Sequence, residues 1–148
     1  MYCTVDDLKG QVREDVLISL VDDDDESPAT LAEASPEMRS RIDVAMTAAT
    51  DEINGYCMAR YPVPFSPVPG VIRKLAVDIT LYNLFARRGY DENSADRSIL
   101  DRYKYAVKAL ESIAKGTVTL GTPVPPATSE VDIRSNNRVY GRDKLDAF

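Results

Sequence analysis

Histidine is absent from this chain of 148 residues, and cysteine occurs only as Cys3 and Cys57. The lack of histidine removes the most common general base and the most common protein ligand of transition metals. Two cysteines without CxxC spacing cannot build a zinc site alone, so we interpret both as free thiols packed like small apolar residues. The sequence also lacks a glycine-rich phosphate loop, a nucleophile elbow and paired catalytic carboxylates. It therefore predicts a protein with no enzymatic activity and no cofactor.

Long apolar runs are missing as well. No window approaches the roughly 18 apolar residues that a membrane-spanning helix needs. The first seven residues, Met1 to Asp7, lack the basic and apolar regions of a signal peptide. We therefore expect a soluble, cytoplasmically made protein with no membrane partner. A hydrophobic content of 44% suffices for one core, and the length fits one domain with an arm.

Charge is distributed unevenly along the chain. Residues 1–68 contain 14 acids and 5 bases, a net charge of −9, whereas residues 69–148 contain 10 acids and 13 bases, a net charge of +3; the two sum to −6. A net negative charge disfavours binding of nucleic acid through its phosphates. The uneven distribution suits head-to-tail association, in which the acidic part of one subunit meets the more basic part of the next.

Local signals predict helices in the first half of the chain. Thr4, followed three residues later by Asp7, matches the capping box that begins a helix. Apolar residues at helical spacing predict two short helices before the acidic residues that start at Asp22. Ser35-Pro36-Glu37 combines a cap residue, a proline at the first helical position and an acid at the positive helix end. We expect a long helix from Pro36 to about Met58.

Similar signals predict two helices in the second half, from about Gly70 to Arg88 and from about Ile99 to Lys115. Gly89 is expected to cap the first of them, with Arg87 and Arg88 forming its solvated end rather than a phosphate clamp. The fold class is therefore all-α: a small bundle of about four to five helices with a proline-rich connector and an extended C-terminal arm.

The connector, residues 61–69, contains four prolines, which exclude a helix and predict an extended, polyproline-like segment. We expect it to lie across a hydrophobic surface and to set the angle between the helices that it joins. The aromatic residues around it are predicted to pack between helices, with a peptide-binding groove as the alternative. They are Tyr56, Tyr61, Phe65, Tyr82 and Phe85.

Five consecutive acids, Asp22 to Glu26, predict an exposed and solvated loop, because like charges repel one another. A calcium site of the EF-hand type is the alternative. Its ligands would be Asp22, Asp24, Glu26 and Glu33 at loop positions one, three, five and twelve. Position six requires glycine but carries Ser27, with Pro28 following, so we favour a loop without a metal.

The character of the chain changes after Gly116. We divide it into a helical core, residues 1–116, and an extended arm, residues 117–148. The last part of the arm, from Arg134 to Phe148, is polar with only a few apolar anchors, and such a segment cannot bury enough surface to order itself. It is therefore expected to bind another subunit. The anchors are Val139, Tyr140, Leu145 and Phe148.

Several segments together resemble the Mu-like phage Gp36 family over nearly the whole chain. These segments are Met1-Tyr2-Cys3-Thr4-Val5-Asp6-Asp7-Leu8, Ile53-Asn54-Gly55-Tyr56, Ala59-Arg60-Tyr61-Pro62-Val63-Pro64, Pro67-Val68-Pro69, residues 75–84, residues 102–110, Ile113-Ala114-Lys115-Gly116 and Asn137-Arg138-Val139-Tyr140-Gly141-Arg142-Asp143. The Ala-Arg-Tyr-Pro-Val-Pro element is fairly specific to that family.

The resemblance implies a head–tail connector of a tailed phage. Such a protein forms a ring under the portal, expected here to be a dodecamer that matches the portal's symmetry. The ring extends the DNA channel, through which DNA passes without specific binding, and it offers an attachment surface to a tail-terminator or stopper protein. The acidic loop would line the channel or its rim. The protein would reside in the virion at the head–tail junction, and in the host cytoplasm during assembly.

The resemblance also implies that the C-terminal arm docks on the portal protein. The expected partner-binding residues are Arg134, Arg138, Val139, Tyr140, Arg142, Leu145 and Phe148. Two alternatives stay open: another neck or tail-completion protein of the virion, and a DNA-associated helical protein.

Overall fold

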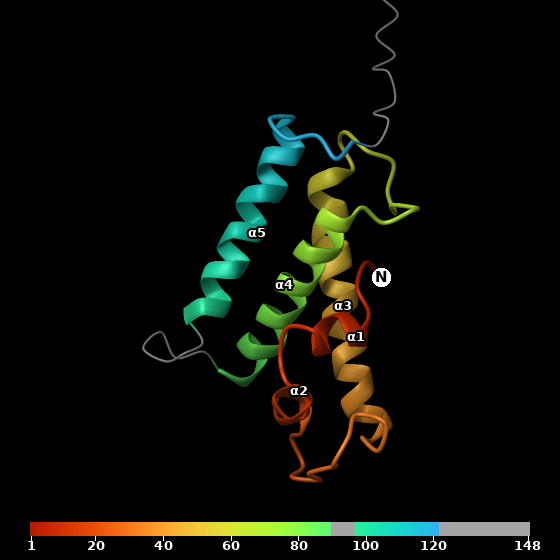
Figure 1. Ribbon diagram of the computed structural model, residues 1–148, viewed down its shortest axis with the longest axis vertical. Coiled ribbons are helices and arrows are strands. Elements are labelled where there is room, and N and C mark those ends of the chain that lie inside the picture. The colour runs from red at the N-terminus through yellow and green to blue at the C-terminus, as the bar shows by residue number, and fades with distance from the viewer. Residues whose placement is uncertain (90–96, 122–148) are drawn as a thin grey trace, which may run out of the picture.

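The computed structural model describes residues 1–89 and 97–121, and within them it contains five α-helices and no strand (Figure 1). The helices are α1 (Val5–Lys9), α2 (Glu14–Val21), α3 (Pro36–Cys57), α4 (Gly70–Arg88) and α5 (Arg97–Lys115). This confirms the predicted all-α bundle. None of these helices is long and apolar enough to cross a lipid bilayer.

The helix starts follow from short-range hydrogen bonds. Thr4 Oγ1 accepts the backbone N–H of Asp7 at 3.3 Å, and the Asp7 carboxylate accepts the backbone N–H of Thr4 at 2.8 Å, which completes the predicted capping box. Ser35 Oγ accepts the backbone N–H of Met38 at 3.4 Å at the start of α3. Gly89, with φ 93°, follows α4 as predicted.

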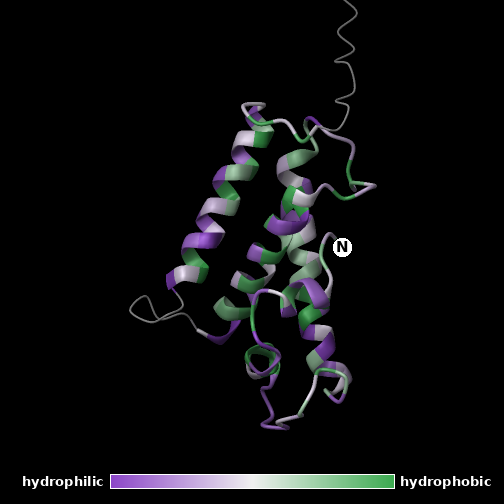
Figure 2. Ribbon diagram, in the orientation of Figure 1, coloured by the Kyte–Doolittle hydropathy of each residue, from purple (hydrophilic) through white to green (hydrophobic). Residues whose placement is uncertain are grey.

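Helices α3, α4 and α5 form the body of the bundle and contact one another in every pairing. In Figure 1, α3 and α5 run in the same direction and α4 runs against them. Helix α2 packs on both α3 and α4, and α1 packs on α4. Apolar and polar residues alternate along α5 in Figure 2, as expected of a helix with one buried face. Its buried side includes Ile99, Ala106, Leu110 and Ile113.

The predicted stripe of α3 is buried along its length, and it is joined in one core by apolar side chains from every other helix. The largest fully buried side chains are Leu8, Leu17, Val21, Met38, Ile42, Ile53, Ile72, Ile79, Leu81, Leu84, Leu110 and Ile113. Both thiols are buried too, and burial raises the pKa of Cys3 and of Cys57, so neither resembles a reactive thiolate.

The proline-rich connector lies on the core, as expected, but it is not one straight extended segment. Its chain bends at Val63–Pro64 and again at Ser66–Pro67, so the predicted straight, polyproline-like path was wrong there. Phe65 is buried, with its ring centroid 5.7 Å from that of Tyr2 and 6.0 Å from that of Tyr61. The Tyr2 hydroxyl accepts the backbone N–H of Phe65 at 3.0 Å and donates to Asn54 Oδ1.

The bundle has two different ends. At one, which we call the arm pole, lie the connector, the C-terminal end of α5 and the last described residue, Gly121 (top of Figure 1). The backbone N–H of Leu120 donates to the Tyr61 hydroxyl at 3.2 Å, which holds the first residues of the predicted arm against the bundle. At the other end, the acidic pole, lie α2 and the acidic loop (bottom of Figure 1).

Candidate functional site

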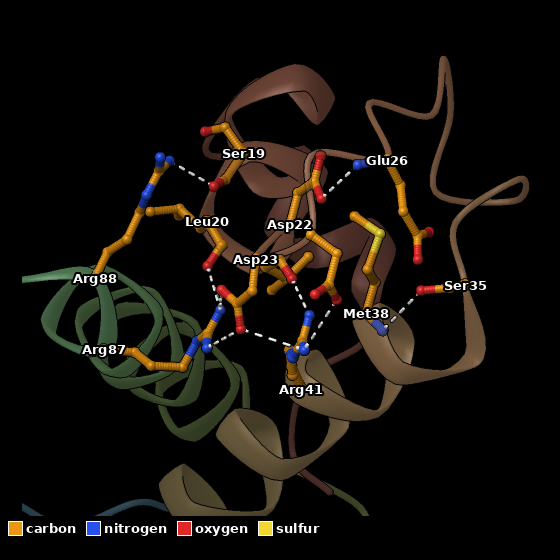
Figure 3. Close-up of polar contacts among 12 residues, drawn as sticks. Ser19, Leu20, Asp22, Asp23, Glu26, Ser35, Met38, Arg41, Arg87 and Arg88 are labelled. Carbon is orange, nitrogen blue, oxygen red and sulfur yellow. Dashed lines mark hydrogen bonds and ion pairs between the residues drawn. The ribbon is translucent and has the colours of Figure 1, made fainter.

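The acidic loop at the acidic pole begins at Asp22, directly after α2, and Asp22 organises the turn. Its carboxylate accepts the backbone N–H of Ser27 at 2.8 Å. It also accepts the backbone N–H of Glu26 at 3.0 Å (Figure 3). These backbone donors lower the pKa of Asp22, because they stabilise its charged form. Asp25 and Ser27 have positive φ values of 56° and 47°, which the tight turn requires.

Asp23 joins the loop to two helices. One of its oxygens, Oδ1, is 2.7 Å from Arg87 Nη2, and the other, Oδ2, is 2.8 Å from Arg87 Nη1 and 3.2 Å from Arg41 Nη2. Arg87 belongs to α4 and Arg41 to α3, so a single carboxylate bridges both (Figure 3). The Arg87 hydrogen bonds lower the pKa of Asp23 and raise that of Arg87. We call Asp23, Arg41 and Arg87 the acidic clasp.

The same arginines hydrogen-bond to the end of α2. Arg87 Nη2 donates to the Leu20 carbonyl at 3.0 Å and Arg41 Nη1 to the Val21 carbonyl at 2.6 Å. Arg88 donates to the Ser19 carbonyl. The last carbonyls of a helix have no partner within it and carry partial negative charge, so three guanidinium groups both satisfy and neutralise this end.

One prediction about this region is therefore corrected. Arg87 and Arg88 are not merely a solvated helix end, because they cap α2, a different helix. The acidic loop is exposed from Asp23 to Glu26 as predicted, but the hydrogen bonds of Asp22 and Asp23 fix its position. Asp24 comes within 3.8 Å of Arg41. The sequence shows both the run of acids and the two arginines, but nothing in it indicates that they contact each other.

The calcium alternative gains no support from this geometry. Both oxygens of Asp22 accept backbone N–H groups. Among residues 1–89 and 97–121, no three histidine, cysteine, aspartate or glutamate side chains lie close enough together to hold a metal ion.

A second ionic group lies beside α1, α4 and α5. Asp78 is only 2% exposed, and its Oδ2 accepts Lys74 Nζ at 2.8 Å while its Oδ1 accepts Arg102 Nε at 2.9 Å. Arg102 Nη2 also donates to Gln11 Oε1 at 3.0 Å, so α5 is tied to the segment that follows α1. These residues border an open surface cavity of about 280 Å³, which Asp7 also lines.

The predicted aromatic packing between helices is confirmed. Tyr61 and Phe65 are buried, and Tyr56 and Phe85 are half-buried against the core. Tyr82 of α4 stacks on Tyr103 of α5, with ring centroids 4.0 Å apart.

Tyr103 adds a polar link across the bundle. Its hydroxyl donates to Glu52 Oε1 of α3 at 3.1 Å. Burial, and next the nearby charge of Glu52, raise the pKa of Tyr103 to about 12. A stacked ring and a hydrogen bond therefore connect α3, α4 and α5.

The partner-binding residues predicted from the sequence all lie outside the described residues. They are Arg134, Arg138, Val139, Tyr140, Arg142, Leu145 and Phe148. Their role stays a prediction. The structure does locate the root of the arm, because residues 117–121 lie at the arm pole, at the opposite end of the bundle from the acidic clasp.

Comparison with known proteins identifies relatives of this chain. The family described as Bacteriophage Mu, Gp36 matches residues 2–135. The chain is also 28% identical over 127 residues to the "Mu-like prophage FluMu protein gp36" of Haemophilus influenzae (strain ATCC 51907 / DSM 11121 / KW20 / Rd). That alignment covers 83% of this chain and 86% of the Haemophilus protein. The family match includes every described residue except Met1, and it stops before the 137–143 segment that also suggested the resemblance.

Proposed function

The chain belongs to the phage Mu Gp36 family, and from this membership we propose that it is a head–tail connector of a tailed phage or prophage. In this role it is a structural virion protein without enzymatic activity. Copies form a ring beneath the portal, expected to be a dodecamer, that extends the DNA channel and provides an attachment surface for a neck or tail protein.

The observation that carries this proposal is the difference between the two ends of the bundle. A connector has to present one surface toward the head and another toward the tail. Here the root of the arm, residues 117–121, lies at one pole and the acidic loop occupies the other, with the 19 residues of α4, about 28 Å of helix, between them. The arm would dock on the portal protein through its last residues, 134–148.

The acidic pole suits a channel through which DNA slides. Asp24, Asp25 and Glu26 are exposed, and the acidic clasp fixes the loop that carries them to α3 and α4. Fixed negative charges repel phosphates, so DNA would pass without being held. The clasp keeps these charges in one place in every copy of the ring.

Absence of catalysis is part of the proposal. Its support is the family membership together with the burial of both thiols, whose raised pKa keeps them protonated.

Deletion of residues 134–148 tests the role of the arm. The shortened chain should keep the helical circular dichroism and thermal unfolding of the full chain, because the five helices and the connector already share one buried core. It should no longer bind purified portal protein or portal-bearing heads in co-sedimentation, and negative-stain images should show no ring on the portal. Undiminished portal binding by the deletion variant would refute the arm's role. Co-purification of the full chain with the tail tube but not with the portal would favour a tail-completion protein instead.

A further inference from the structure

Helix α3 carries an outward face that nothing in the described chain covers. Exposed residues recur on it at alternating intervals of four and three, the spacing of a helix–helix seam. They are Val44, Ala48, Asp51, Gly55 and Met58, the last being the residue that follows the helix. Val44 is 65% exposed and Met58 is 68% exposed, although both are large apolar residues.

Gly55 is the most informative member of this face. A glycine inside a helix costs about 1 kcal/mol relative to alanine. A Cβ added at Gly55 would meet nothing within 4 Å, so no contact inside the described chain requires the missing side chain. A glycine lets another backbone approach the helix closely, because it has no side chain in the way. This points to a second chain.

Charge identifies the partner surface. The exposed charged residues on the outward face of α3 are both acids, a net charge of −2: Asp51, and Glu37, which lies two helical turns before Val44 on the same side. The exposed charged residues of α5 comprise four bases and two acids, a net charge of +2: Arg97, Lys104, Lys108, Lys115, Asp101 and Glu111. Beside them Tyr105 is 72% exposed, and an exposed tyrosine next to cations is a common interface anchor.

We propose that the outward face of α3 in one copy receives the outward face of α5 in the next copy of this chain. The inference rests on the proposed function and names the contact that would build its ring. Helices α3 and α5 turn their buried faces toward each other and α4, so their outward faces point in different directions. One copy can therefore use both faces at once, which is the head-to-tail arrangement that closes into a ring.

The direction of the helices sets the register. If the ring axis follows the bundle, neighbouring copies stay parallel, and residues at equal distance from the arm pole meet. Asp51 lies seven residues before Met58, and Lys108 lies seven residues before Lys115, at the same pole. Asp51 therefore faces Lys108 of the neighbouring copy. One turn further along α3, Gly55 leaves room for the α5 backbone of that copy.

The contact is small. A helix of 19 residues is about 28 Å long, and a face about 10 Å wide gives roughly 300 Å². Stable interfaces need about 800 Å² on each partner. The free chain should therefore associate weakly, and the ring should become stable on the portal, where the arm adds a second contact.

Charge reversal in the full-length chain tests the pairing. Asp51→Lys alone and Lys108→Glu alone should each weaken ring formation on purified portal about tenfold or more, because each places like charges together. The double variant should restore it. Glu33→Lys makes the same change of charge at an exposed residue outside both faces, and it should leave ring formation unchanged.

Two further variants separate misfolding from a blocked contact. Gly55→Trp should abolish ring formation while its thermal unfolding stays at or above that of the wild type, since the space beside Gly55 is open in the single chain. In a mixture, Ala48→Cys on one set of chains should form disulfides with Lys104→Cys on another, and neither set should do so alone. The native thiols are buried and should not form disulfides in this experiment.

The outcomes distinguish this inference from the proposed function. If rings form on the portal but Asp51→Lys behaves like Glu33→Lys, or Gly55→Trp assembles normally, the α3–α5 contact is wrong and the connector role stands. If the wild-type chain never joins the portal, the connector role fails, and the inference falls with it.

Discussion

Asp78 is a single residue on which three parts of the bundle depend. Its carboxylate is almost fully buried, and a buried charge is tolerated only when hydrogen-bonded counter-charges replace the lost water. Arg102 supplies part of this from α5, and Lys74 supplies the rest from one turn earlier in α4. The two cations differ in their own exposure: the side chain of Arg102 is 32% exposed and that of Lys74 is 73% exposed.

This difference predicts unequal effects of removing each cation. Arg102→Met should lower the free energy of unfolding by about 2 kcal/mol, because it leaves the buried carboxylate with one mobile partner and also breaks the bond to Gln11. Lys74→Met should cost less than about 1 kcal/mol, since an exposed ammonium is strongly screened by water. Urea unfolding followed by circular dichroism measures both. Equal losses would mean that Arg102 has no special role in holding α5.

At the scale of elements, α2 depends on its surroundings. It has eight residues, and isolated helices shorter than about 12 residues are marginal in water. Its N-cap residue, Arg13, makes no capping hydrogen bond through its side chain. Stability must therefore come from its buried face and from the arginines of α3 and α4 that hydrogen-bond to its last carbonyls. Asp23 holds two of those arginines in position.

The acidic clasp predicts a dependence of stability on pH. The pKa of Asp23 is lowered in the folded protein by Arg87, and in the unfolded chain it lies near 3.9. The clasp thus contributes fully to the stability of the fold above about pH 5. This contribution disappears as the pH falls below about 4 and through the pKa that Asp23 has in the folded protein. Asp23→Asn should therefore lower the melting temperature at pH 7, and the difference from wild type should shrink steadily on acidification.

Melting curves between about pH 7 and pH 2.5 test this. The matched control is Asp25→Asn in the same loop, where asparagine suits the positive φ of 56° and the side chain is exposed. Its melting temperature should follow that of the wild type at every pH. A difference between Asp23→Asn and wild type that persists unchanged at the lowest pH would contradict an electrostatic clasp.

At the scale of the whole molecule, the main property is that the two ends of the bundle differ. The first residues of the arm, 117–121, and the bent connector share one pole, and the exposed acids of the loop occupy the other. With a net charge of −6, the protein should not be drawn to DNA at either pole strongly enough to hold it.

We therefore expect no retardation of duplex DNA by the purified chain, even at low salt. Replacing Asp24, Asp25 and Glu26 with Asn, Asn and Gln leaves the clasp intact and removes three negative charges. Any residual DNA binding should rise in this variant, because repulsion of phosphates is reduced. A mobility shift by the wild-type chain that disappears steeply with added salt would favour the alternative of a DNA-associated protein.

The sequence alone determined the helices and the buried stripe of α3. The cap residues Thr4, Ser35 and Gly89 act only on backbone groups a few residues away. The apolar residues of each helix recur with its period of 3.6 residues. Both the helix ends and the buried faces can therefore be predicted without knowing the fold. The straight, polyproline-like path predicted for the connector was wrong, because contacts with Tyr2 and the core, far away in sequence, bend the chain.

Only the tertiary structure decided which charges meet. Asp23 and Arg87 are 64 residues apart, and the loop offers several acids to several arginines. A carboxylate's charge is visible in sequence, but its partner depends on distance, and distance is set by how the helices pack. For the same reason, the bundle's two unlike poles and the uncovered face around Gly55 became visible only when α3, α4 and α5 were placed together.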